Sequence, residues 1–91
     1  MAASQARLMA LVARKQDLEL SLAFIAQART ALAKTASGVV SAPPSAQRDA
    51  ALAALLAQDR ALEAEVRRLN TQLAGVQAEI EAARRALQNG S

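Results

Sequence analysis

Apolar residues recur at alternating steps of three and four along residues 51–87, with one interruption at Asp59. This spacing keeps one narrow stripe of an α-helix apolar and is typical of a coiled-coil seam. A similar seam runs from Leu8 to Ala36, where Lys15 and Arg29 take the place of apolar residues. The apolar seam positions are Leu8, Leu11, Leu18, Leu22, Ile25, Leu32, Leu52, Leu55, Leu62, Val66, Leu69, Leu73, Val76 and Ile80. Two seams in one chain predict two helices that pack against each other.

The composition limits both the fold and its chemistry. Alanine and leucine, the strongest helix formers, dominate the sequence, so we expect an all-α protein. The chain contains no cysteine or histidine, which excludes disulfide bonds and the usual zinc ligands. Its closely spaced glutamates are two residues apart and do not face each other on a helix. We therefore expect neither an enzyme nor a cofactor-binding protein.

Capping residues and prolines place the first helix and the turn. Ser4 is the predicted N-cap of a helix over about residues 4–36, which Gly38 would end in a left-handed conformation. A turn over residues 37–45 follows, because Pro43 and Pro44 lack the N–H donor that a helix needs.

The second helix begins directly after the prolines. Ser45 is its predicted N-cap, and the helix is expected over about residues 46–88, with Asn89-Gly90 as its C-terminal signal. Val39 and Val40 are expected to fold back over the first leucines of this helix. Two long helices joined by a short turn predict an antiparallel two-helix coiled-coil hairpin, with residues 1–91 as a single domain.

One pair of opposite charges interrupts the two seams. In an antiparallel register centred on the turn, Arg29 and Asp59 fall in adjacent layers. We predict an interhelical ion pair that fixes the register and orientation of the helices. The simpler alternative is a partly solvated pair that contributes little to stability.

The outer faces of the two predicted helices differ in the size of their side chains. The second helix carries an almost continuous strip of small side chains facing away from the seam, whereas the first carries Leu20 and Phe24. Small residues let another helix approach closely, and a lone two-helix hairpin buries little apolar surface, so we expect a homo-oligomer. The alternative is that alanine is only a good surface helix former. The predicted assembly contacts are Leu20, Phe24, Ala57, Ala61, Gly75 and Ala78.

The charges give little support to a nucleic-acid partner. The net charge is +3, and the basic pairs are interleaved with glutamates and accompanied by no aromatic stacking platform. This arrangement favours a solvated face over phosphate contacts.

The sequence also bears on location. No apolar run is long enough to span a bilayer or to form the core of a secretory signal, so we expect a soluble protein, cytoplasmic or assembled without a cleaved signal. Residues 1–16 are basic and amphipathic, and a mitochondrial presequence is the alternative for them.

The layout of the chain resembles that of the needle subunits of type III secretion systems. The resemblance rests on Ala42-Pro43-Pro44-Ser45 at the turn and on the Ile80 to Asn89 end of the longer helix. It implies a helical hairpin that polymerises into a hollow tube, with the carboxy-terminal helix facing the lumen.

Three functions remain open at this point. The first is a structural subunit that self-assembles through its outer helix faces into a filament, tube or bundle. The second is a small coiled-coil adaptor or secretion chaperone that binds a helix of another protein. The third is a small basic nucleic-acid-associated protein.

Overall fold

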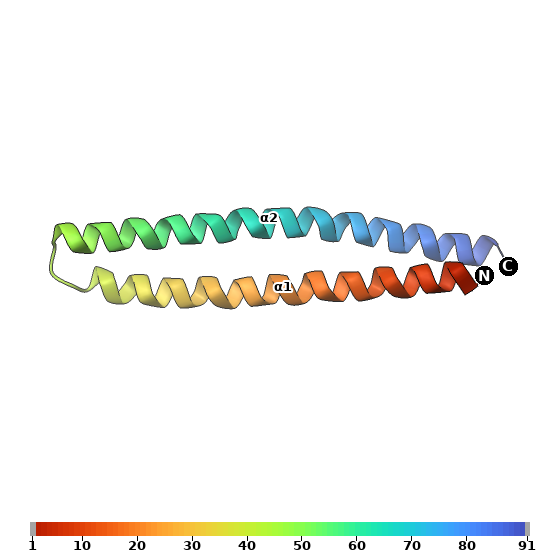
Figure 1. Cartoon of the computed structure of the whole chain (residues 1–91), viewed down its shortest axis with the longest axis horizontal. Helices are drawn as coiled ribbons and strands as arrows, with labels where there is room; N and C mark the ends of the chain where they lie inside the picture. Colours follow the sequence, from red (N-terminus) through yellow and green to blue (C-terminus); the bar gives the residue numbers. More distant parts are fainter. Residues whose placement is uncertain (1, 91) are drawn as a thin grey trace. The chain divides into compact units, whose positions relative to one another are not determined.

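The chain forms two helices joined by a short turn (Figure 1). The computed structural model describes residues 2–90, so Met1 and Ser91, the ends of the predicted domain and the first residue of the possible presequence, lie outside it. Helix α1 spans Ala2–Val40 and has 39 residues, and helix α2 spans Ala46–Asn89 and has 44. Within residues 2–90 there is no strand. The predicted all-α helical hairpin is confirmed.

Helix α1 is longer at both ends than the sequence predicts. It already includes Ala2, so Ser4 lies inside the helix and is not its N-cap. It also continues through Gly38 to Val40, and none of the glycines in residues 2–90 adopts the left-handed conformation that was expected to end the helix. A glycine inside a helix costs only about 1 kcal/mol relative to alanine, which the neighbouring turns of a long helix can offset.

Pro43 is the residue that stops α1. Proline disfavours the α conformation of the residue before it, here Ala42, so the helix must end by that point. The last turn closes with hydrogen bonds from the Ser41 N–H to the Ser37 carbonyl at 3.3 Å and from the Ala42 N–H to the Val39 carbonyl at 3.0 Å. The turn is therefore residues 41–45 and not 37–45. Val40 belongs to the helix and is 56% exposed, so the expectation that it folds back over α2 is wrong.

Ser45 caps the start of α2 as predicted. Its Oγ accepts a hydrogen bond from the Arg48 N–H at 3.0 Å, and its carbonyl accepts one from the Asp49 N–H at 3.1 Å. The carboxylate of Asp49 also lies in the first turn, at the positive end of the helix dipole. At the other end, α2 stops at Asn89, and the Gly90 N–H donates to the Ala86 carbonyl at 2.8 Å.

Arg48 links the two helices at the turn. Its Nη1 donates to the carbonyls of Ala42 at 3.3 Å and Val40 at 3.5 Å. The Val40 carbonyl ends α1, where the helix cannot supply donors of its own, and the Ala42 carbonyl lies in the turn that follows. A side chain in the first turn of α2 thus satisfies the last carbonyl of α1 and one carbonyl of the turn.

The helices divide into two compact units, in each of which a segment of α1 packs beside a segment of α2. The terminal unit comprises Met1–Leu22 and Arg68–Ser91, and the turn unit comprises Ala23–Arg67. In the terminal unit four seam side chains are buried: Leu18, Leu69, Val76 and Ile80. In the turn unit no described side chain reaches that degree of burial, and Leu32, Leu52, Leu55 and Leu62 are half-buried.

Candidate functional site

Arg29 and Asp59, in the turn unit, form a two-pronged ion pair between α1 and α2. The Arg29 Nε donates to Asp59 Oδ1 at 2.9 Å, and its Nη2 donates to Oδ2 at 3.1 Å. Their side chains are 36% and 35% exposed, so the pair is half-buried. The hydrogen bonds from Arg29 lower the pKa of the Asp59 carboxyl, although partial desolvation acts in the opposite direction. The same hydrogen bonds raise the pKa of Arg29.

The ion pair lies at the edge of a groove between the helices, here called the ion-pair groove. The small side chains of Ala33 and Ala36 leave this space open, and Leu56, at 51% exposure, lines it. Its lining comprises Arg29, Leu32, Ala33, Ala36, Leu52, Leu55, Leu56 and Asp59.

A second groove in the turn unit, here called the alanine groove, has a different lining. It comprises Ala28, Ala31, Leu32, Thr35, Gln58, Ala61 and Leu62. None of these side chains is charged. The Thr35 hydroxyl donates to the Ala31 carbonyl at 3.0 Å, so its one donor is already used within α1. The alanine groove is therefore a largely apolar surface bordered by both helices.

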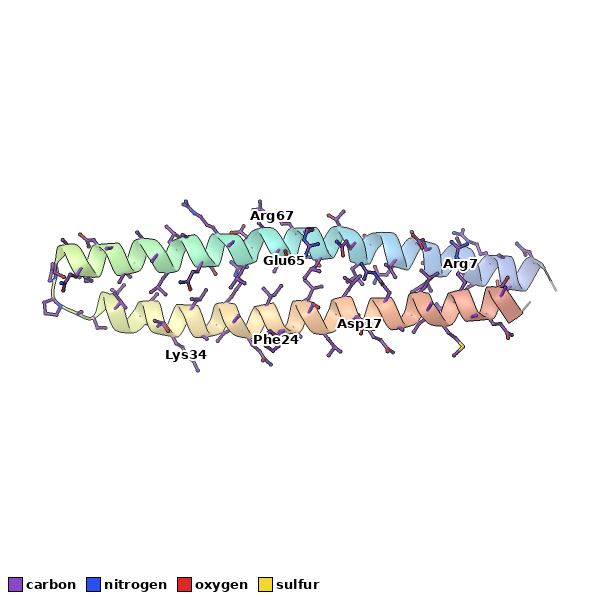
Figure 2. All side chains as sticks on the ribbon, in the orientation of Figure 1. Arg7, Asp17, Phe24, Lys34, Glu65 and Arg67 are labelled. Carbon is purple, nitrogen blue, oxygen red and sulfur yellow. The ribbon has the colours of Figure 1, made fainter. Side chains whose placement is uncertain are left out.

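Several large apolar side chains are exposed. Phe24, labelled on α1 in Figure 2, is 75% exposed, and Met9 and Leu20 on the same helix are 73% and 69% exposed. Val40 and Leu56 are also more than half exposed. Single exposed apolar residues are normal on a protein surface, but four on one helix, with only four buried side chains in residues 3–90, are a pattern that needs a reason.

The structure distributes the predicted assembly contacts over the two units. Phe24, Ala57 and Ala61 lie in the turn unit, where Ala61 lines the alanine groove and Ala57 does not. Leu20, Gly75 and Ala78 belong to the terminal unit and are exposed. Apart from its chain neighbours and the nearby backbone of its own helix, a Cβ added at Gly75 would meet no atom within 4 Å, so α2 has open space beside this residue.

Sequence reasoning missed the exposed Met9 and Leu56 and both grooves. Met9 and Leu56 each follow a seam leucine directly, so they point off the seam by one residue. Their position one residue after a seam position could have predicted that they would be exposed. The grooves depend on which small side chains lie opposite each other, and a heptad assignment does not supply that.

The terminal unit carries a more polar surface. The Arg14 Nη2 donates to Gln72 Oε1 at 3.4 Å, across from α1 to α2. Nearby, Lys15 shares a groove with Glu81 and Arg84. Among residues 2–90 no three acidic side chains gather closely enough to hold a metal ion. This surface offers exposed cations and carboxylates in mixture and favours neither sign.

No known protein family matches this sequence, and comparison with curated proteins and with solved structures gives no match either. Neither described helix contains a stretch long and apolar enough to cross a membrane. The candidate site therefore consists of the ion-pair groove, the alanine groove, the Arg29–Asp59 pair and a set of exposed apolar side chains.

Proposed function

We propose that this chain is a structural subunit that self-assembles through the outer faces of its helices into a filament, tube or bundle. The observation that carries the proposal is the imbalance between exposed and buried apolar side chains. Five large apolar side chains are more than half exposed, whereas four are buried in the described part of the chain. Small helical scaffolds usually compensate for so small a core by oligomerising.

Self-assembly would cover the exposed side chains at little cost. Alanine and glycine on α2, among them Ala57, Ala61 and Gly75, let a second helix approach closely. Leu20 and Phe24 on α1 offer larger apolar side chains to pack on such a surface. The layout that resembles secretion-needle subunits is compatible with this mode of growth.

The proposal is tested by size-exclusion chromatography with light scattering over a hundredfold range of protein concentration, with negative-stain imaging of the largest species. Growing mass and regular particles are expected. Phe24→Glu should abolish the growth, because it places a charge where an apolar side chain packs. Thr30→Glu is the matched control, since it adds the same charge at an exposed position of α1 that lies six residues from Phe24 and therefore on another helix face. A stable monomer at every concentration would overturn the proposal, and a mass that stops at a dimer would overturn the filament and the tube.

A second function, a coiled-coil adaptor or secretion chaperone, is favoured by one observation. Four of the five exposed large apolar residues lie on α1, and three of them, Met9, Leu20 and Phe24, lie away from the turn, as expected of a helix that grips one partner helix. An adaptor should keep a constant small mass at all concentrations. It should gain thermal stability only when an amphipathic partner helix is added.

A further inference from the structure

We propose that a second copy of this chain covers the alanine groove, with the α1 segment of each turn unit packed over the α2 segment of the other. The inference rests on the proposed self-assembly and names the contact through which it begins. Three features support this contact: the position of Phe24, the charges of the two helix segments and the area of exposed surface.

Phe24 lies on the same stripe of α1 as the alanine groove. It precedes Ala28 by four residues and Ala31 by seven, spacings that place all three on one helix face. Ala28 and Ala31 line the groove, and Phe24 is the most exposed large apolar side chain described. The turn unit thus presents an apolar ring one helical turn from an apolar groove, a combination that suits a self-complementary contact.

The charges of the turn unit decide which helix faces which. Its α1 segment, residues 23–40, contains the cations Arg29 and Lys34 and no acidic residue. Its α2 segment, residues 46–67, contains three cations and four acidic residues. Packing α1 over α1 of a second copy would oppose two positive segments, whereas packing α1 over α2 opposes unlike net charges.

The exposed area is sufficient for such a contact. The chain exposes 6513 Å², and the surface scaling of compact monomers gives about 5,000 Å² for its mass of 9.5 kDa. The excess of about 1,500 Å² belongs to the whole chain. Burying the roughly 800 Å² that each partner loses in a standard interface would still leave the chain with more surface than a compact monomer of its mass.

A two-fold axis parallel to the helices satisfies these conditions. It places each α1 segment over the α2 segment of the other copy and buries both alanine grooves in the same interface. Because Ala28 and Ala61 line the same groove, Phe24 of one copy, one turn before Ala28, lies close to Ala61 of the other. The result is a four-helix arrangement whose new core is the alanine groove.

Disulfide trapping tests the arrangement, since the natural chain contains no cysteine. Full-length chains carrying Phe24→Cys and Ala61→Cys, with tags of different size, are mixed and oxidised. The mixed disulfide should form about tenfold more than in a control mixture of Phe24→Cys with Ala53→Cys, because disulfide geometry tolerates little misplacement. Ala53 is an exposed alanine of the same α2 segment that does not line the groove.

The outcomes separate this contact from self-assembly in general. A disulfide between two chains that both carry Phe24→Cys, as the main product, would mean that α1 packs on α1. It would overturn the contact but not self-assembly. Equal trapping in the control mixture would also overturn it. A natural chain that stays monomeric at all concentrations would overturn both proposals. Far-UV circular dichroism of each variant checks that helicity is retained.

Discussion

The Arg29 guanidinium and the Asp59 carboxylate meet through two hydrogen bonds while both side chains keep about a third of their surface exposed. Planar two-pronged contacts of this kind fix orientation as well as distance, which lysine could not do in the place of arginine. The pair also occupies positions that the heptad reserves for apolar residues. Its role in setting the helix register, inferred from the sequence, stays a prediction that the contact geometry makes specific.

Stability should depend on pH through Asp59. Its pKa is lowered in the folded chain, so its contribution is fully present above the ordinary carboxyl range and is lost as pH falls through the lowered pKa. The raised pKa of Arg29 places any loss from that side at strongly alkaline pH. The stability advantage of the natural chain over Asp59→Asn, measured by urea denaturation, should therefore shrink below about pH 4. An advantage that is equal at pH 7 and pH 2 would contradict this.

Gly75 makes a second prediction at this scale. It lies inside α2 with open space around the position of a Cβ, so Gly75→Ala should stabilise the chain by about 0.5–1 kcal/mol. The reverse change at its exposed neighbour, Ala74→Gly, should destabilise by a similar amount. Urea midpoints of both variants provide the measurement. If Gly75→Ala lowered the free energy of unfolding instead, another part of the protein or a second chain would have to lie against Gly75.

At the scale of the helices, the two ends of the turn differ in how they are built. The start of α2 depends on the Ser45 side chain, whereas the end of α1 depends on Pro43 and on the guanidinium of Arg48. The serine cap was predictable because its signal is local: Ser45 precedes a helical run directly. The Arg48 contact was not predictable, because it joins residues from different helices through the geometry of the turn.

Ser45→Ala should cost about 1 kcal/mol, since it removes the hydrogen bond to the Arg48 N–H. For a chain of this size the melting temperature should fall by roughly 4–8 °C. Ser41→Ala is the control, because the Ser41 hydroxyl donates to the Ser37 carbonyl and caps no helix start. Thermal melts followed by circular dichroism would disprove the cap if the two variants lost the same stability.

The helix boundaries show where local signals were insufficient. Ser37 and Gly38 have the composition of a helix end, and yet α1 passes through them in helical conformation. Gly38 permits the left-handed conformation but does not require it, whereas Pro43 has no N–H to continue the helix and disfavours the α conformation at Ala42. Seam positions were predictable from periodicity, and the predicted seam residues are all buried or half-buried. The exposure of Leu56 and the outline of the grooves follow from packing across helices and could not be predicted residue by residue.

At the scale of the whole molecule, burial is uneven. The four buried side chains all belong to the terminal unit, and the turn unit contains the ion-pair groove, the alanine groove and the Arg29–Asp59 pair. Each unit was described by the same heptad, so periodicity alone could not distinguish them. The difference arises from alanines 28, 31, 33 and 36 in α1, which are too small to fill the space between the helices of the turn unit.

Leu18→Ala should therefore be among the most destabilising single changes in the chain. Leu18 is 4% exposed, and truncating a buried leucine to alanine costs about 2–5 kcal/mol. Leu20→Ala, two residues away and 69% exposed, should change stability by about 0.5 kcal/mol or less at protein concentrations too low for assembly. Urea denaturation of both variants decides the matter. Equal losses would mean that Leu20 is covered in solution.

The open packing of the turn unit should affect how often the helical hydrogen bonds of its backbone open. Amide protons protected only by helical hydrogen bonds, with few apolar contacts beside them, exchange through small local openings. In dilute solution the amides of residues 46–67 should therefore exchange with deuterium sooner than those of residues 68–89. If a second chain closes over the alanine groove, concentrating the sample should slow exchange in the first group and leave the second nearly unchanged. The exchange rates of the backbone amides of residues 46–67 would then measure assembly directly.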